Sequence, residues 1–324
     1  MLHGEAGPLA AAEAAARAIS PPGGFPLAHA GGAGHWDGLG LALAALVVTV
    51  VVAGLRRGPR DRFARRLASF VAGWGLLTIA LWSPLHDYGH DSFALHMAQH
   101  LLLIAIVPPL LLHARIGLAV RDALPRRWLV RSAPVLRLGH RVRGLALSGP
   151  GRVAIAFAHA TVLWTTHTPW LYEAALFSSM LHHAEHGALL LSAYAVWWSA
   201  MTAPAARSGG SILALGLSGA AGGVLATLII VSPTPWSASH DPQAVGLPYT
   251  LLEDQQLGGG VMLLVGSVVW TLAAVTCFVR WLRATEHRQQ ARERRALRAD
   301  PDAVAGGTTE RLPRVGATDR EVST

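Results

Sequence analysis

The 324-residue sequence has no lysine, a single cysteine and few charged residues of any kind. One cysteine, Cys277, excludes a disulfide scaffold and any metal site built from paired thiolates. Charged residues make up 14% of the chain, whereas soluble domains carry roughly 25%. Apolar residues make up 52%, and the mean hydropathy is positive. The composition therefore argues against an ordinary soluble protein and favours one that lies in a lipid bilayer.

Seven predominantly apolar stretches are long enough to cross a bilayer as helices, which takes about 20 residues each. They lie near 39–55, 67–85, 93–112, 152–168, 180–201, 210–232 and 257–281. Pro108 and Pro109 fall inside the third stretch and predict a kink there, with neighbouring helices satisfying the freed carbonyl groups. The predicted fold class is all-α, a polytopic membrane bundle of about seven transmembrane helices.

The arginines predict the orientation of this bundle. All 27 basic residues are arginine, and 26 of them share one side of the membrane if seven spans alternate. Six lie in 56–66, nine in 113–152, one at position 207 and ten from position 280 onward. The positive-inside rule makes that side cytoplasmic, with the N-terminus outside and the C-terminus inside. The net charge of +8 is then explained by anionic membrane lipid as the partner, and nucleic-acid binding is not expected.

The predicted topology divides the chain into three parts. Residues 1–37 are rich in alanine, glycine and proline and predict a flexible outer tail. Residues 38–282 predict the membrane domain, which includes a basic cytoplasmic loop at 113–151. Residues 283–324 predict a disordered, arginine-rich cytoplasmic tail, with a helical start allowed.

Histidines are unusually numerous, 16 in all, and most of them fall toward the predicted outer side. Three predicted spans each carry two histidines at a helical spacing, which puts the two side chains on one helix face or nearly so. These candidates are His96 with His100, His182 with His186, and His159 with His167. Ionisable groups inside a span normally face the bundle interior or a wet cavity. We therefore expect the imidazoles to meet in one pocket in the outer half of the bilayer.

Converging imidazoles predict a metal site, because imidazole is a good ligand for copper, zinc, iron and nickel. Methionines at a similar depth would shift the preference toward copper, although packing explains them more simply. Carboxylates and amides nearby would orient the imidazoles and attract the cation. The residues expected to support the site are Gln99, Glu185, Glu253, Asp254, Gln255, Met97 and Met262. We interpret His86, His90 and His240, in predicted outer loops, as interfacial residues more often than ligands.

Two other functions fit the same histidines. Imidazoles on two facing helices could hold haem iron from both sides or support a di-metal redox centre, and a Soret band would identify haem. A metal permease would need polar groups that continue to the cytoplasmic half of the spans. The inner halves of these spans are nearly all apolar, which counts against a permease.

Four motifs resemble those of the CtaG-type multi-spanning cytochrome c oxidase assembly factors, a family associated with caa-type oxidases. They are HMAQH at 96–100, HTP at 167–169, LHHAEH at 181–186 and EDQQLGG at 253–259. The resemblance covers roughly residues 67–281. It implies a multi-pass protein of the bacterial inner membrane that is not an enzyme and that helps copper reach the oxidase. The implied partners are cytochrome c oxidase subunits and a periplasmic copper chaperone.

Overall fold

The computed structural model describes residues 38–131, 139 and 142–299. The outer tail predicted at 1–37 and the end of the C-terminal tail, 300–324, lie outside the described residues. Every regular element in the described part is helical, which confirms the all-α fold class. The long helices are α2 (Gly38–Arg57), α3 (Arg60–Trp82), α10 (Gly149–Thr166), α12 (Ser179–Met201), α13 (Gly209–Val231) and α14 (Leu251–Ala299). The third predicted span is one continuous rod built from α5 (Phe93–Leu101), the π-helix η1 (Leu102–Ile106) and α6 (Val107–Ala114).

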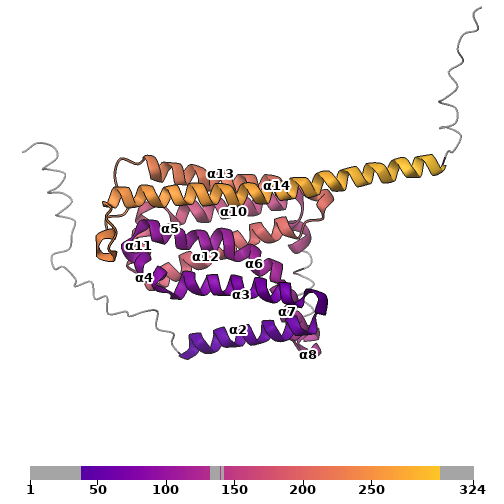
Figure 1. Ribbon diagram of the computed structural model, residues 1–324, viewed down its shortest axis with the longest axis horizontal. Helices are drawn as coiled ribbons and strands as arrows, with labels where there is room; N and C mark the ends of the chain where they lie inside the picture. Colours follow the sequence, from indigo (N-terminus) through magenta and orange to yellow (C-terminus); the bar gives the residue numbers. More distant parts are fainter. Residues whose placement is uncertain (1–37, 132–138, 140–141, 300–324) are drawn as a thin grey trace, which may run out of the picture.

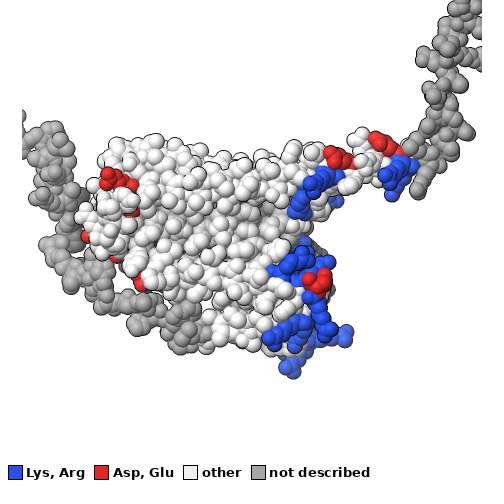
Figure 2. Space-filling model, viewed as in Figure 1, with Lys and Arg blue, Asp and Glu red and all other residues white. Residues whose placement is uncertain are grey.

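These long elements pack side by side as a bundle (Figure 1). Four of them are long and apolar enough to cross a membrane: Arg60–Trp82, Phe93–Ala114, Gly209–Val231 and Leu251–Ala296. The chain is therefore a membrane protein, and the full count of seven spans remains a prediction. On the face drawn in Figure 2, arginines gather at one end, and the opposite end shows acidic side chains without basic ones. This separation of charge is the pattern that the positive-inside argument requires.

Short helices connect the long ones at the two ends of the bundle. At the end away from the arginines lie α4 (Pro84–Asp91), α11 (Pro169–Leu176) and the 3-10 helix η3 (Pro242–Val245). At the arginine-rich end lie α7 (Ile116–Ala123), α8 (Arg126–Arg131) and the 3-10 helix η2 (Ala205–Arg207). The C-terminal helix α14 does not end near residue 282 but continues to Ala299, so the helical start allowed for the tail extends through its first 17 residues.

The proline pair disturbs the third span in the way its chemistry requires. Pro108 and Pro109 occupy the first turn of α6, directly after the π-helical turn η1, where a missing N–H is tolerated. Pro108 cannot donate to the carbonyl of Ile104, four residues earlier. That carbonyl instead accepts a hydrogen bond of 2.9 Å from the indole N–H of Trp197 on α12. The expected rescue of a freed carbonyl by a neighbouring helix is confirmed, and it ties α12 to the third span.

Two glycines let α14 lie in close contact with the third span and with α13. A Cβ atom at position 258 would lie 2.6 Å from Cδ1 of Phe93 and 3.1 Å from Cα of Ala94. A Cβ atom at position 259 would lie 2.8 Å from Cγ1 of Ile230. Neither position tolerates a larger residue without movement of a neighbour, so the glycines fix how α5 and α13 flank α14.

Candidate metal centre

Three helices bring histidines together at the end of the bundle opposite the arginines. The short helix α4 starts with Ser83, whose hydroxyl accepts from the N–H of Leu85, and with proline at its first position. A single residue, Ser92, separates α4 from α5. Both helices lie near α12 (Figure 1). The histidines of these helices form what we call the imidazole cluster: His86, His90, His96, His100, His182 and His186.

The two predicted histidine pairs lie face to face in this cluster. The Nε2 atoms of His96 and His100 are 3.0 Å apart, and those of His182 and His186 are 3.2 Å apart. Across the helix interface, the ring centroids of His96 and His182 are 5.3 Å apart and stacked. The centroids of His100 and His186 are 5.1 Å apart. The expectation that imidazoles from separate spans meet in one place agrees with this geometry.

Hydrogen bonds to the other ring nitrogens indicate which atoms of the cluster can bind a cation. Nδ1 of His96 lies 3.2 Å from the carbonyl oxygen of Gly89 and must donate to it, which leaves a lone pair on Nε2. Nδ1 of His100 and Nδ1 of His186 are buried without a partner among the described residues. These nitrogens are therefore free to take the proton in the tautomer that exposes Nε2 to a metal ion.

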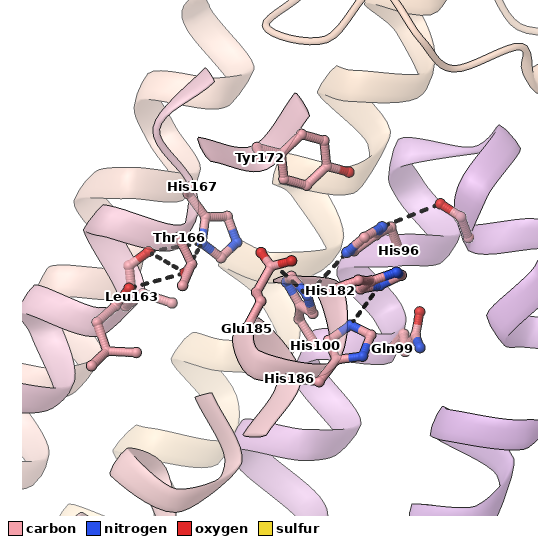
Figure 3. Close-up of polar contacts among 12 residues, drawn as sticks. His96, Gln99, His100, Leu163, Thr166, His167, Tyr172, His182, Glu185 and His186 are labelled. Atoms are coloured by element: carbon pink, nitrogen blue, oxygen red, sulfur yellow. Dashed lines mark hydrogen bonds and ion pairs between the residues drawn. The ribbon is translucent and has the colours of Figure 1, made fainter. Parts of the chain in front are cut away.

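Glu185 introduces a buried carboxylate beside these imidazoles. The residue is 6% exposed, and neither of its carboxylate oxygens accepts a hydrogen bond from any described residue. Its Oε1 lies 4.0 Å from Nε2 of His100, and Figure 3 shows the carboxylate between His167 and the imidazoles of α5 and α12. A buried carboxylate without a partner is costly unless a cation or a proton neutralises it. Glu185 could therefore supply a negatively charged ligand to a cation held by the imidazoles.

The donor atoms are close enough together to coordinate one ion. Three sets of donors each have their ligand atoms within 4.8 Å of one another: His96 with His100 and His186, His96 with His182 and Glu185, and His86 with His182 and His186. Two nitrogens bound to one ion at about 2.0–2.1 Å are about 3 Å apart, which matches the separations within both pairs. The residues present therefore fit a metal ion with imidazole ligands and one carboxylate.

His86 and His90 belong to the imidazole cluster, although the sequence predicted that both lie in a loop. They lie on α4 instead. The ring centroid of His86 is 5.3 Å from that of His182, and the centroid of His90 is 4.8 Å from it. The same four-residue spacing that marked the other two pairs was the available signal. Nδ1 of His86 accepts from the amide of Gln99, so His86 could bind an ion through this nitrogen only in place of that hydrogen bond; burial together with His90 lowers the pKa of His86.

His240 and Tyr172 border the imidazole cluster. Nδ1 of His240 donates to the carbonyl oxygen of His90 at 2.9 Å, and its Nε2 accepts from the hydroxyl of Tyr172 at 2.8 Å. Both nitrogens of His240 are therefore engaged, so this residue joins the loop before α14 to α4 and α11 rather than offering a donor. Tyr172 packs against the cluster with its ring centroid 5.1 Å from that of His96.

The two histidines predicted as a pair on α10, His159 and His167, lie in different places. His167 caps the end of α10 and lies beside the cluster, with its ring 5.3 Å from that of His100. Its Nδ1 donates to the carbonyl oxygen of Leu163, and its Nε2 is buried without a partner among the described residues. His159 lies apart from the cluster, where Nδ1 faces the hydroxyl of Ser192 and the ring packs against Trp270. Eight residues of helix rotate a side chain by roughly 80°, so the two rings do not share a face.

Most of the residues expected to support the site hold helices in place. Asp254 is fully buried and accepts from the hydroxyl of Ser92 and the N–H of Phe93, which caps the start of α5. Gln255 bonds to the carbonyl of Ile229 and the N–H of Trp236. Glu253 is exposed and forms a capping box with Thr250 at the start of α14.

Three supporting residues remain. Gln99 donates to the carbonyl oxygen of Ala80 at 2.6 Å as well as to His86, so it orients an imidazole as expected. Met97 and Met262 belong to the apolar core of the bundle, in agreement with the packing interpretation of the methionines. Of the residues expected to support the site, only Glu185 and Gln99 therefore contact the imidazoles of the cluster.

Comparison with known proteins identifies the family. The model of the cytochrome c oxidase caa3 assembly factors (Caa3_CtaG) matches residues 46–284, which include every helix that contributes to the imidazole cluster. No curated protein and no solved structure matches the chain. The match covers well over half of the sequence, and it agrees with the resemblance carried by the motifs around the histidines. The chain therefore belongs to the cytochrome c oxidase caa3 assembly factors.

Proposed function

We propose that this assembly factor binds copper at the imidazole cluster and delivers it to an apo-oxidase subunit. The observation that carries the proposal is the convergence of His96, His100, His182 and His186 beside the buried carboxylate of Glu185, which accepts no hydrogen bond from the described residues. Family membership supplies the oxidase as the destination. Copper here is cargo rather than a resident cofactor, and no catalytic role is proposed for the protein.

The overlapping donor sets support a transfer function. His186 belongs to two of the three sets, and His96 and His182 each belong to two as well. An ion held by one set can therefore exchange one ligand for another without leaving the cluster. A carrier needs such exchange, because an ion held by a closed and saturated ligand shell would leave slowly.

The location of the cluster supports delivery on the outer side of a bacterial inner membrane. The cluster lies at the end of the bundle opposite the arginines, and arginine-rich ends of membrane proteins face the cytoplasm. A multi-pass topology with this orientation would accept copper from a periplasmic chaperone. Surface carboxylates such as Asp87 and Asp91 on α4 would attract the cation toward the cluster.

The crowding of the donors favours an ion over haem, the second function considered. Ligand atoms of His96, His100 and His186 lie within 4.8 Å of one another, whereas haem ligands must approach one iron from the two faces of a wide ring. A permease would need polar groups beyond the cluster, and the buried residues that pack the bundle there belong mainly to two hydrophobic clusters, with Arg66 and Arg152 buried at the arginine-rich end.

The test is metal analysis of the purified protein together with its absorption spectrum. We expect the wild type to retain copper without a Soret band. The variant with His96, His100, His182 and His186 all changed to alanine should lose the metal and leave the oxidase copper-deficient in cells. A control with three exposed histidines changed to alanine, His113, His183 and His287, should behave as wild type. Equal copper content in all three proteins would refute the proposal.

A further inference from the structure

A second polar site lies at the opposite end of the bundle. A cavity of about 850 Å³ opens there between the N-terminal ends of α10 and α13 and the side of α14. Arg143, Arg152 and Arg207 all line it, and none of the described residues around it is acidic. Three arginines that line one space, with no acidic residue among the described lining residues, create a positive site, although the guanidinium of Arg143 also lies over the ring of Trp198. Like charges in such proximity are unfavourable unless an anion compensates them.

Arg152 is the most informative of these residues. Its side chain is 2% exposed, and only one of its nitrogens, Nη1, has a partner, the carbonyl oxygen of Arg207 at 2.8 Å. The Nε and Nη2 atoms are buried and donate to no acceptor among the described residues. A buried guanidinium is stable only when its donors are satisfied, and its planar fork matches the oxygens of a phosphate or carboxylate group. The missing acceptor is therefore expected to be an anion.

Two helix N-termini meet at the same place. α10 begins at Gly149 and α13 at Gly209, and a Cβ atom at position 210 would lie 3.3 Å from Cα of Gly149. Both helices direct the positive ends of their dipoles at the cavity, and helix N-termini bind phosphate readily. Ser208, the residue before α13, makes no side-chain hydrogen bond to the first turn. Gly149 and Gly209 both line the cavity, but at α10 the hydroxyl of Ser148 already accepts from the N–H of Gly151 and Pro150 has no N–H, so the first turn of α13 is the better donor.

We propose that this cavity binds a phosphate-bearing anion through Arg143, Arg152, Arg207 and the first turn of α13. An anionic phospholipid headgroup and free phosphate share this chemistry. The surroundings favour the lipid, because Leu147 and Trp281 add apolar wall to the cavity and the end of a membrane bundle lies at headgroup depth. The bound lipid would hold α10, α13 and α14 together at the end remote from the imidazole cluster.

The test uses purified full-length protein, stripped of lipid in detergent, with three probes. These are a short-chain phosphatidylglycerol, a short-chain phosphatidylcholine and radiolabelled inorganic phosphate. Arg152→Gln removes the buried guanidinium, and the double variant Arg143→Gln with Arg207→Gln removes the two exposed ones. The matched control, Arg60→Gln with Arg65→Gln, removes two exposed arginines from the same end of the bundle, outside the cavity. Size-exclusion profiles and helical circular dichroism establish that each variant is folded.

We expect phosphatidylglycerol to bind saturably and more tightly than phosphatidylcholine. Both cavity variants should bind it at least about tenfold more weakly, the loss expected from one hydrogen bond to a charged group, and the control should not. Saturable binding of inorganic phosphate with the same variant pattern, without lipid binding, also supports the site and assigns it to free phosphate. Equal weakening in the cavity variants and the control, or no saturable binding of any probe, would overturn the proposal. The copper site can fail without affecting this outcome.

Discussion

Nε2 of His96 and Nε2 of His100 lie 3.0 Å apart on one face of α5, and the first of these nitrogens carries a lone pair because Nδ1 of the same ring donates to Gly89. Two neutral imidazoles at that distance share either a proton or a cation. The neighbouring carboxylate of Glu185, which has no partner among the described residues, favours the cation. The first two predictions test a histidine as a ligand of the ion and Glu185 as the negative charge beside it.

His186→Ala should reduce copper retention more than His183→Ala on the same helix, and His182→Ala should reduce it to a similar extent. His182 and His186 each belong to two of the three donor sets, so the loss of either leaves only one set intact. We expect at least about a tenfold loss of affinity, since removal of even an outer-shell partner of a metal typically costs that much. The measurement is competition for copper(I) against a chromogenic chelator. His183→Ala, at an exposed position on the same helix, should retain the affinity of the wild type.

Glu185→Gln should weaken copper binding without destabilising the metal-free protein. The amide has nearly the same shape as the carboxylate but removes a buried charge that no described residue neutralises. Copper at 100 times its Kd should stabilise the wild type by about 2.7 kcal/mol. At that concentration the variant should gain clearly less, as measured from thermal unfolding with and without copper(I). Glu286→Gln, an exposed change on α14, serves as the control. An unchanged response of Glu185→Gln to copper would show that the carboxylate does not face the ion.

Local rules predicted a large part of this molecule. Hydropathy over about 20 residues located five of the long helices to within three residues, because each helix must satisfy its own backbone in lipid, whereas α3 begins seven residues before the predicted span and α14 extends 18 residues beyond it. A four-residue spacing placed His96 beside His100 and His182 beside His186, because the helix repeat alone fixes that geometry. The proline pair predicted a disturbed third span for the same reason, since a missing N–H is a property of the residue itself.

Contacts between distant segments could not be predicted in this way. The run from His86 to Asp91 was assigned to a loop, yet Ser83 caps a helix there that brings His86 and His90 to the cluster. A serine followed by proline was a readable start signal for that helix. The role of Asp254 depended on α14 packing beside the start of α5, which no local pattern encodes.

The separation of His159 from His167, in contrast, follows from helix rotation and was predictable from the eight-residue spacing.

Asp254→Asn should destabilise the protein, whereas Glu253→Gln at the neighbouring position should have a small effect. Asp254 accepts from Ser92 and from the N–H of Phe93, and it is fully buried. Loss of charged hydrogen bonds at a buried helix start should cost about 1.5–3 kcal/mol of unfolding free energy. The exposed capping box of Glu253 should contribute less, because water competes for its hydrogen bonds. Chemical denaturation in detergent measures both, and a larger effect of Glu253→Gln would contradict this assignment.

Acidification should loosen the loop over the imidazole cluster before it unfolds the bundle. Glu173 on α11 accepts from the N–H of Ala238 and the hydroxyl of Ser239, in the loop that also carries His240. Burial alone would raise the pKa of Glu173, but these hydrogen bonds outweigh it, and the net pKa lies below its usual value. The stabilisation from Glu173 is therefore complete above the pKa of the unfolded chain and is lost as the pH falls through the lower, folded value. Hydrogen exchange of the loop amides should accelerate over that acidic range in the wild type.

In Glu173→Gln the loop should exchange faster already at neutral pH and show little further change on acidification, because the titrating group is gone. Equal pH dependence in both proteins would assign the effect to another group.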